Sequence, residues 1–369
     1  MENYMRDFKR ILIVKLGSIG DVVHGLPLLK TLRKNYPSAY IVWVVESKAR
    51  EILQGNKDLD EIIVINTREL RKRVNLSTIN EMIGKIKVLR SKGFDLAIDI
   101  QGLIKSGVIA YLSRAIVRIG FNRGDAREPL NRLFMTIEPP LIGKDIHVID
   151  KNLSLLRFLG LNSFSKEFTI QTSPADEWYI DDLFKEKGID LSNGLIVINT
   201  GVGFKTKGWP AKNYAELSRR IMDELNKKVI LIWGPGEEGL VREISDMMHH
   251  KPIIPPLTTI KQATALIRRC EMFIGGDTGP LHIASALKIP TVAIFGPTDP
   301  IRNGPYGDNH TVIHKDLVCS GCYKRRCQTM ECMKGITAEE VYRAVKEKVY
   351  RFSDNKLHKA RGRNPSKAY

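Results

Sequence analysis

The sequence predicts an α/β protein of two domains, each built on a parallel sheet. Three observations carry this prediction. Short apolar runs alternate with longer segments that repeat apolar residues at helical spacing, and this alternation starts afresh about halfway along the chain. The chain has 369 residues, which is enough for two domains that each bury a core of their own.

The first series of elements occupies the N-terminal half. Its apolar runs are short and continuous, as is typical of parallel strands that are buried on both faces. The predicted strands are Ile11–Val14, Ile41–Val45, Ile62–Ile65 and Leu96–Ile98. Apolar residues at helical spacing predict helices over Asp21–Lys34, Ile79–Leu89 and Ile149–Leu159.

The second series repeats the pattern in the C-terminal half. The predicted strands are Leu195–Ile198, Val229–Trp233, Met272–Ile274 and Thr291–Phe295, and the clearest helices are Tyr214–Leu225, Leu240–Met248 and Thr337–Tyr350. The polar stretch Asn162–Pro174 separates the two series. The predicted domains are therefore residues 1–172 and residues 173–350, followed by a tail over residues 351–369.

Composition excludes several classes of protein. Hydrophobic residues make up 43% of the chain and charged residues 27%, which is typical of globular proteins and excludes a fibrous or largely disordered chain. No run of apolar residues is long enough for a membrane-spanning helix. The first apolar run is cut short by Lys15 and no cleavage pattern follows it, so it is a poor signal peptide. We expect a cytoplasmic protein.

The net charge predicts an anionic partner. Lys and Arg number 58 against 41 acidic residues, giving a net charge of +17. Such an excess favours nucleic acid, an anionic membrane surface or a phosphorylated substrate. Residues 315–369 hold 14 basic and 6 acidic residues, and residues 355–369 hold five basic residues and no acidic one. This last composition predicts a disordered basic tail.

The loop after the first strand is the first candidate site, because ligands of open α/β sheets bind beyond the carboxyl ends of strands. Lys15–Asp21 reads KLGSIGD and leads into a predicted helix, whose first N–H groups favour an anion. It matches neither the dinucleotide fingerprint G-x-G-x-x-G nor the P-loop. Ser18 and Asp21 also have the spacing of a capping box, so Asp21 has a structural interpretation as well.

Two loops of the second series have the composition of a nucleotide site. Asn199–Pro210 reads NTGVGFKTKGWP, so its backbone and a lysine can surround a phosphate; a solvated surface loop is the alternative. Trp233–Glu238 reads WGPGEE, and a carboxylate there can accept hydrogen bonds from ribose hydroxyls. The alternative for this carboxylate is an acid at the start of a helix.

The segment Phe273–His282 is the sharpest signal in the chain. It reads FIGGDTGPLH, a strand followed by a turn and by a proline at the expected first position of a helix. We expect the backbone N–H groups of Thr278 and Gly279 to face a ligand, with His282 one turn further on. A packed or surface histidine is the alternative for His282.

Four of the five cysteines are clustered. Cys319, Cys322, Cys327 and Cys332 have the pattern C-x2-C-x4-C-x4-C, whereas Cys270 stands alone. Because a cytoplasmic chain should not carry permanent disulfides, we consider a structural zinc ion or an iron–sulfur cluster. The spacing differs from that of a typical zinc ribbon, so reduced thiols or an adventitious disulfide are the alternatives.

These motifs together resemble glycosyltransferase family 9, the bacterial heptosyltransferases of lipopolysaccharide core synthesis. The segments that carry the resemblance are ILIVKLGSIGDVVHGLPLL from Ile11, DIQGLIKSG from Asp99, AREPLNRLF from Ala126, KGWP from Lys207 and GGDTGPLHIASALKIPTVAIFGPTDP from Gly275. The second and third segments are most similar to the branch that adds heptose to Kdo on lipid A. The cysteine pattern is similar to one found in many members.

The resemblance implies a GT-B fold, in which two facing Rossmann-like domains bind the acceptor and the nucleotide sugar. It implies an inverting, metal-independent transfer of heptose from ADP-heptose to a Kdo or heptose acceptor on the lipid A inner core, with no cofactor required. Asp21 then corresponds to the general base. The donor-binding positions are Thr200, Gly201, Lys207, Glu237 or Glu238, Asp277, Thr278, Gly279 and His282. Thr200 and Gly201 depart from the Thr-Thr pair of the family.

The chemistry that the resemblance implies is physically coherent. A sugar hydroxyl is a weak nucleophile near neutral pH, so a carboxylate must take up its proton. The helix start around Asp21 favours the ionised carboxylate. Departure of ADP leaves negative charge on a phosphate, which Lys207 and the N–H groups of Thr278 and Gly279 are suited to stabilise.

The charged residues of the acceptor site are predicted from their basic character. Arg118, Arg123 and Arg127 cluster near Lys105 in sequence and are suited to carboxylates or phosphates, with solvated surface arginines as the alternative. Gly20 belongs to the same candidate acceptor site. The expected partners are ADP-heptose, a Kdo–lipid A type acceptor and the anionic inner leaflet, with the enzyme peripheral to the inner membrane.

Three other functions are open to test. A second or third heptosyltransferase of the same family would use a different acceptor. A nucleic-acid-binding protein would explain the charge, but the sequence has no recognition-helix, RRM or zinc-finger pattern, so we expect no nucleic acid. A nicotinamide oxidoreductase is disfavoured because neither half contains G-x-G-x-x-G.

Overall fold

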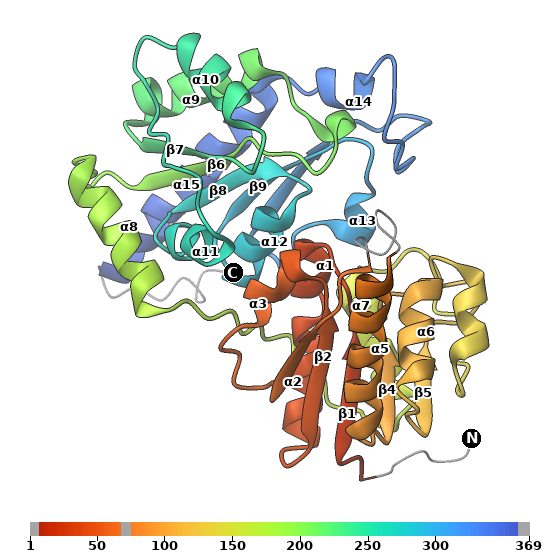
Figure 1. The fold of residues 1–369 in the computed structure, drawn as a ribbon. Coiled ribbons are helices and arrows are strands. Elements are labelled where there is room, and N and C mark those ends of the chain that lie inside the picture. The colour runs from red at the N-terminus through yellow and green to blue at the C-terminus, as the bar shows by residue number, and fades with distance from the viewer. Residues whose placement is uncertain (1–6, 68–74, 361–369) are drawn as a thin grey trace. The chain divides into compact units, whose positions relative to one another are not determined.

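The chain folds into two α/β units (Figure 1). The computed structural model describes residues 7–67 and 75–360. The chain divides into Met1–Ser173 and Pro174–Tyr369, here called the N-terminal and C-terminal units. The predicted boundary after residue 172 thus differs by one residue. The sequence pattern does not predict the helix α8 (Pro174–Glu186) that begins the C-terminal unit.

The N-terminal unit is built on a five-stranded parallel sheet in the order β3-β2-β1-β4-β5. Four of the strands lie where the apolar runs predict them, whereas the sequence pattern misses β5 because this short strand contains an arginine and ends in glycine. The strands are β1 (Arg10–Val14), β2 (Tyr40–Val45), β3 (Glu61–Val64), β4 (Leu96–Asp99) and β5 (Val117–Gly120).

The prediction of one helix over Asp21–Lys34 is wrong. The segment forms two helices, α1 (Ile19–Val23) and α2 (Leu26–Asn35), which are separated at Gly25. A Cβ atom at Gly25 would lie 2.6 Å from the ring of Trp43, so the chain can approach the sheet this closely only with glycine at this position. The other helical segments are η1 (Ser47–Ala49), α3 (Arg50–Leu53), α5 (Leu76–Ser91), α6 (Ile104–Leu112), η2 (Pro129–Phe134) and α7 (Val148–Arg157).

The C-terminal unit has its own five-stranded parallel sheet, in the order β10-β9-β8-β6-β7. The four predicted strands are present. The sequence pattern misses β10, a partly exposed edge strand whose ends are histidines. The strands are β6 (Leu195–Asn199), β7 (Lys228–Ile232), β8 (Met272–Gly276), β9 (Thr291–Phe295) and β10 (His310–His314).

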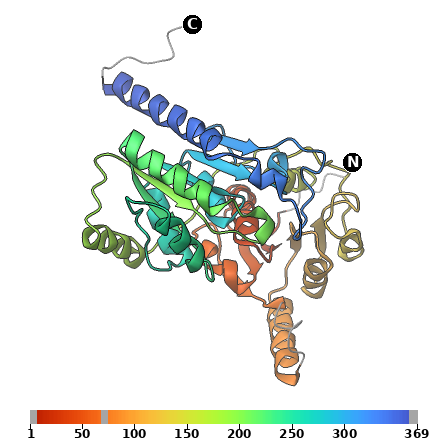
Figure 2. The same ribbon diagram turned by 90° about the horizontal axis from the view of Figure 1, so that it is seen from above.

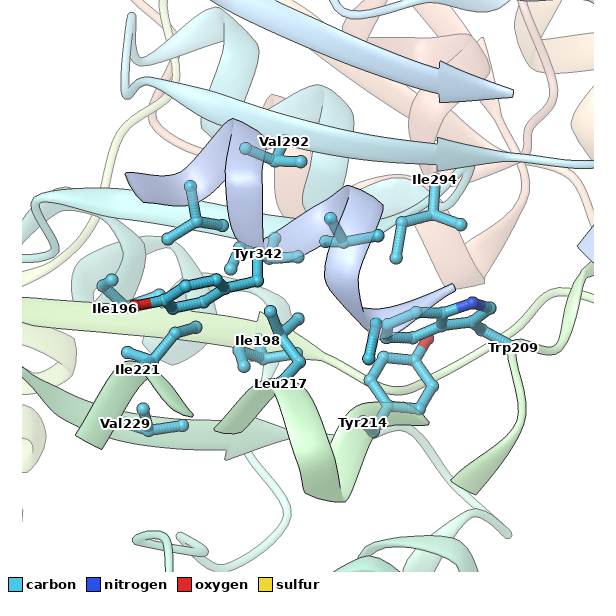
Figure 3. Close-up of a cluster of buried hydrophobic side chains, with 14 of the residues drawn as sticks. Ile196, Ile198, Trp209, Tyr214, Leu217, Ile221, Val229, Val292, Ile294 and Tyr342 are labelled. Atoms are coloured by element: carbon cyan, nitrogen blue, oxygen red, sulfur yellow. The ribbon is translucent and has the colours of Figure 1, made fainter. Parts of the chain in front are cut away.

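Buried aromatic and aliphatic side chains join one face of this second sheet to its helices (Figure 3). The rings of Trp209 and Tyr214 meet edge to face with centroids 4.9 Å apart. The indole N–H of Trp209 donates a hydrogen bond of 2.9 Å to the Ile336 carbonyl. This anchor fixes the end of the loop that follows β6, and α9 (Ala211–Leu225) begins directly after it.

The last helix is longer than predicted. Helix α15 (Ala338–Ala360) lies along α9 and the second sheet, as Figure 2 shows. Residues 351–360, for which the composition predicts disorder, are therefore helical, and residues 361–369 of the predicted tail lie outside the described residues. The remaining helical segments are η3 (Lys205–Lys207), α10 (Glu238–Asp246), α11 (Ile260–Arg268), α12 (Gly279–Ala286), α13 (Pro300–Asn303) and α14 (Glu331–Lys334).

Each sheet has one point at which the strand order reverses, and the carboxyl ends of the strands there form a crevice for ligands. In the N-terminal sheet this point lies between β1 and β4. In the C-terminal sheet it lies between β6 and β8. The segments that follow β1, β6 and β8 carry Asp21, Lys207 and Asp277, whereas the Trp233–Glu238 motif follows the edge strand β7. Within the described part of the chain, no helix combines the length and the apolar character needed to cross a bilayer.

Candidate active site

Asp21 lies in the first turn of α1, directly beyond β1. Ser18 caps this helix, and the Ser18 N–H donates a 2.7 Å hydrogen bond to Oδ2 of Asp21. The structural interpretation of Asp21 as part of a capping box is therefore confirmed. It does not account for the other carboxylate oxygen.

Two cations approach that second oxygen, Oδ1. The Lys15 ammonium lies 3.5 Å from it and the Arg127 guanidinium 3.8 Å from it. Lys15 is buried and also donates a 2.9 Å hydrogen bond to the Ile100 carbonyl, so its position is fixed by the loop after β4. Charges this close favour the ionised carboxylate. An anionic carboxylate at the mouth of a ligand crevice is suited to accept a proton.

Asp99, at the end of β4, holds the surrounding loops together. Its buried carboxylate accepts hydrogen bonds from the N–H groups of Gln101 and Gly102, from the Ser106 hydroxyl and from the Asn131 amide. Burial raises the pKa of Asp99, although these hydrogen bonds act in the opposite direction. The network joins β4, α6 and η2 into one rigid support beneath the crevice.

Two of the five predicted acceptor residues, Arg127 and Lys105, lie in ion pairs with acidic side chains. Arg127 lies beside Asp21, because Glu128 donates its N–H to the Gly102 carbonyl and thereby draws the segment of Arg127 to the loop after β4. The Lys105 ammonium pairs with Glu46 at 2.9 Å and bonds Thr67 at 2.8 Å.

The other three predicted acceptor residues differ in their surroundings. The Arg118 guanidinium donates to the Phe134 and Ala115 carbonyls and lies over the Tyr111 ring, toward the start of β5 rather than its carboxyl end. Arg123 is exposed in the loop after β5, and Gly20 is buried within α1.

In the C-terminal unit the loops after β6 and β8 bring Lys207, Asp277 and His282 together. The Lys207 ammonium lies 2.6 Å from one Asp277 oxygen and 2.9 Å from the Asp277 carbonyl. The His282 Nε2 lies 3.0 Å from the other Asp277 oxygen. Burial alone would raise the pKa of Asp277, but the His282 hydrogen bond and the charges of His282 and Lys207 hold it well below its usual range.

Thr278 and Gly279 open α12 at the same edge of the sheet. The Thr278 hydroxyl accepts a 3.0 Å hydrogen bond from the amide of Asn199, the last residue of β6. The first N–H groups of a helix have no partner within it. This helix start therefore places backbone donors next to the Lys207 ammonium, an arrangement that is suited to an anion.

The four remaining predicted donor positions differ in the contacts that their side chains or Cα positions make. The Glu237 carboxylate accepts the Val202 and Gly234 N–H groups at 2.6 and 2.7 Å, and so joins the loops after β6 and β7. A Cβ atom at Gly201 would lie 2.3 Å from this carboxylate, which explains the glycine. Glu238 pairs with Arg242 on the exposed side of α10. The Thr200 side chain is buried and its hydroxyl donates to the Ile232 carbonyl.

The clustered cysteines are not arranged as a metal site. Across residues 7–67 and 75–360, no three His, Cys, Asp or Glu side chains are placed to hold a metal ion. The four thiols are nevertheless close: burial raises the pKa of Cys332, and the charges of Cys319, Cys322 and Cys327 raise it further. The segment also contacts the loop after β6, where the Thr206 hydroxyl donates to the Lys324 carbonyl at 2.7 Å.

Sequence patterns miss three residues of the site. Lys15, Asp99 and Gln101 all lie at strand ends, where they resemble ordinary ends of apolar runs. The side-chain amide oxygen Oε1 of Gln101 accepts the Leu16 and Gly17 N–H groups and so joins the two loops of the crevice. A polar residue at the end of a buried parallel strand or within two residues after it is the signal that identifies all three.

Solved structures resemble the whole chain. A family 9 glycosyltransferase from Veillonella parvula is 24% identical with a TM-score of 0.80, covering 95% of this chain and 99% of that one. The E. coli heptosyltransferase WaaC with ADP is 26% identical with a TM-score of 0.72, covering 92% and 99%. Fold and site thus define a GT-B glycosyltransferase.

Comparison with related sequences narrows the class of glycosyltransferase to one family. Residues 83–333 match the family described as Glycosyltransferase family 9 (heptosyltransferase). Lipopolysaccharide heptosyltransferase 1 of Pseudomonas aeruginosa is 30% identical over 86% of this chain and 87% of its own length. The same enzyme of E. coli K12 is 28% identical over 82% and 92%. The chain belongs to glycosyltransferase family 9 and is a heptosyltransferase of the lipopolysaccharide core group.

Proposed function

We propose that the protein transfers heptose from ADP-heptose to a Kdo-bearing lipid A acceptor, with inversion at the anomeric carbon and without a catalytic metal. The observation that carries the proposal is that each unit has charged groups at its own switch point: a carboxylate held among cations in the N-terminal unit, and a lysine beside a helix start in the C-terminal unit. The first arrangement suits an acceptor hydroxyl and the second suits a sugar diphosphate.

Asp21 is the proposed general base. Its carboxylate takes the proton of the acceptor hydroxyl as the hydroxyl oxygen attacks the anomeric carbon of the heptose. The bond from that carbon to the diphosphate oxygen breaks on the opposite side, so the configuration inverts. Arg127, which lies beside Asp21, is proposed to bind an acidic group of the acceptor, as a planar guanidinium does with a carboxylate.

The diphosphate that leaves with ADP needs positive charge. Lys207 supplies it, after exchanging its ion pair with Asp277 for the donor phosphates, and the N–H groups at the start of α12 add to it. His282 holds Asp277 from the other side. Of the two candidate residues for the ribose we propose Glu237, because its carboxylate borders the loop after β6, whereas Glu238 pairs with Arg242.

The donor is better supported than the acceptor. One solved relative is E. coli heptosyltransferase WaaC with ADP-2-deoxy-2-fluoro heptose, which is 25% identical to this chain. Lipopolysaccharide heptosyltransferase 3 of E. coli is 27% identical, so a heptose acceptor is the second candidate. We favour Kdo because heptosyltransferase 1 enzymes match at higher identity. With an acceptor of this kind, the enzyme works at the cytoplasmic face of the inner membrane.

One reaction tests the proposal. The purified protein is incubated with ADP-heptose and, in parallel, with Kdo–lipid A and with its heptosylated product, and the products are weighed by mass spectrometry. We expect a mass gain of one heptose on the Kdo acceptor, unchanged by EDTA. A mass gain on the heptosylated acceptor alone would assign the enzyme to a later step of core synthesis. No gain on either acceptor would overturn the proposal. Zinc and iron content of the same preparation tests the cysteine cluster.

A further inference from the structure

Large apolar side chains are exposed along one side of the N-terminal unit. On α6, Ile104 and Tyr111 are seven residues apart and therefore lie on the same face of the helix. Leu133 of η2 is 75% exposed, and Ile116, before β5, is 71% exposed. Most leucine and isoleucine side chains of the N-terminal unit are buried in its core. These side chains are exposed, so packing in the core does not account for them.

These side chains form one surface, here called the α6–η2 patch and defined as Ile104, Tyr111, Ile116, Leu130 and Leu133. Helix α6 packs against η2. The rings of Tyr111 and Phe134 lie with centroids 6.1 Å apart, which joins the middle of the patch to Leu133. The Arg118 guanidinium lies over the Tyr111 ring and bonds the Ala115 carbonyl, next to Ile116. The patch is therefore continuous from η2 to the start of β5.

The patch lies in strongly basic surroundings. Residues 104–133 contain six basic and two acidic residues. Arg114 is exposed at the end of α6, and Arg90 donates to the Leu112 carbonyl from the neighbouring helix α5. The nearby acids have partners within the fold: Glu138 pairs with Arg132, and Glu128 accepts the Ile104 N–H. The surface therefore combines apolar side chains with an excess of positive charge.

We propose that the α6–η2 patch is the surface by which the enzyme binds an anionic lipid bilayer. Exposed apolar side chains enter the boundary between headgroups and acyl chains, and arginines around them bind lipid phosphates. Charge complementarity favours this occupant over a second copy of the chain, because two copies would bring like charges together. The inference depends on the proposed function in one respect only: the proposed function identifies the acceptor that the bilayer holds.

The patch lies where binding to a membrane would bring the crevice close to a membrane-bound acceptor. Ile104 is the first residue of α6, directly before Lys105, and α6 starts at the carboxyl edge of the sheet where Asp21 lies. From there the patch continues along α6 to Tyr111. A bilayer against this side of the unit therefore presents its headgroups next to the crevice. Arg118, which does not point to that crevice, has a role in this surface instead.

A vesicle-binding experiment tests the patch. Full-length protein is sedimented with vesicles of phosphatidylcholine containing about one-third phosphatidylglycerol, and with pure phosphatidylcholine, in physiological salt. The double variant Ile116→Ser/Leu133→Ser removes apolar contacts without changing charge. We expect at least tenfold weaker partition onto the anionic vesicles. The matched control, Met247→Ser, removes an exposed apolar residue of the C-terminal unit and should bind as the wild type does.

Two further measurements separate the outcomes. Turnover on a water-soluble Kdo acceptor should be the same in the double variant and the wild type; lack of turnover in both would count against the proposed function and leave the vesicle result standing. Light scattering gives the oligomeric state. Unchanged vesicle binding by the double variant overturns the proposal, and unchanged binding together with loss of a wild-type dimer assigns the patch to contact between copies.

Discussion

At the scale of single residues, Asp21 combines an observed structural role with a proposed chemical one. One carboxylate oxygen caps α1 through the Ser18 N–H, and the other faces Lys15 and Arg127. The cap fixes the position of the side chain, and the cations fix its charge. The two interpretations that the sequence leaves open therefore describe different atoms of one group.

Replacing Asp21 by Asn separates these roles. The amide still accepts the Ser18 N–H, so the fold should be kept, but the group can no longer take up a proton. We expect turnover to fall by about 10²–10⁴ while ADP-heptose binds with nearly unchanged affinity. Steady-state kinetics and calorimetric titration of the donor measure the two effects. Wild-type turnover would show that another group is the base.

The two lysines of η3 allow a matched comparison. Lys207 pairs with Asp277, whereas Lys205 is exposed two residues earlier. We expect Lys207→Met to lower kcat by about 10²–10³, because the departing diphosphate loses its cation. Lys205→Met should leave kcat within about a factor of three, as is usual for a surface position. Equal losses in the two variants would contradict the role given to Lys207.

Asp277 makes stability depend on pH in a defined direction. Its pKa is held below the usual range in the folded protein, so the unfolded chain binds the proton more readily. The stabilisation is present above the unfolded pKa of about 4 and is lost as the pH falls below it. We expect the wild type to lose more stability than Asp277→Asn between pH 6 and pH 3.5, measured by urea unfolding. Parallel losses would show that Asp277 contributes nothing.

At the scale of elements, Asp99 connects one strand to two helical segments. Four donors converge on its buried carboxylate. We expect Asp99→Ala to lower the free energy of unfolding by about 3 kcal/mol or more, because each buried donor left without a partner costs about 1–3 kcal/mol. Asn131→Ala removes one of the donors and should cost less. Urea unfolding of both variants tests this, and a loss no larger in Asp99→Ala would refute the central position of Asp99.

Periodicity predicts the central elements and misses the marginal ones. Strands with continuous apolar runs lie within two residues of their predicted bounds, since burial on both faces requires such runs. β5 and β10 escape prediction because arginine and glycine interrupt the apolar run of β5 and histidines stand at both ends of β10, whereas the edge strands β3 and β7 have the run and are predicted. At the break between α1 and α2, Gly25 lies close to the Trp43 ring, which is distant from it in sequence. A single continuous helix would show the same spacing of apolar residues over Asp21–Lys34, so the sequence pattern does not reveal the break.

The loops of the candidate site are predictable from the sequence, but their contacts are not. Asp277 directly follows β8, and Asp21 and Lys207 lie in the segments after β1 and β6, so their position at the sheet edge follows from topology. The ion pairs of Lys15 with Asp21 and of Lys105 with Glu46 depend on chain segments that the sheet brings together. No spacing in the sequence encodes these pairs, and so the sequence predicts an acceptor role for Lys105 without its partner in the fold.

At the scale of the whole molecule, the net charge of +17 includes two segments to which we assign the proposed membrane binding. One is the α6–η2 patch, in which apolar contact adds to charge. The other is the basic segment 361–369, which lies outside the described residues and whose contribution to binding can only be electrostatic on its composition. Salt distinguishes them, because it screens charge and leaves apolar contact intact.

Deleting residues 361–369 should therefore weaken vesicle binding several-fold at low salt and little at high salt. Turnover on a soluble acceptor should be unchanged. Sedimentation with anionic vesicles at two salt concentrations, for the deletion and for Ile116→Ser/Leu133→Ser, compares the two sources. Equal salt dependence of both variants would show that the patch binds through charge alone.

The hydrogen bond from Lys15 to the Ile100 carbonyl joins residues 85 positions apart. On the ribosome, Asp21 therefore emerges long before the backbone that fixes its lysine partner. Asn131, which bonds Asp99, emerges later still. A nascent chain that ends before Asn131 has the proposed general base in its sequence but lacks part of the support beneath the crevice. Premature termination in this region yields fragments without a completed crevice, whatever helices and strands they contain.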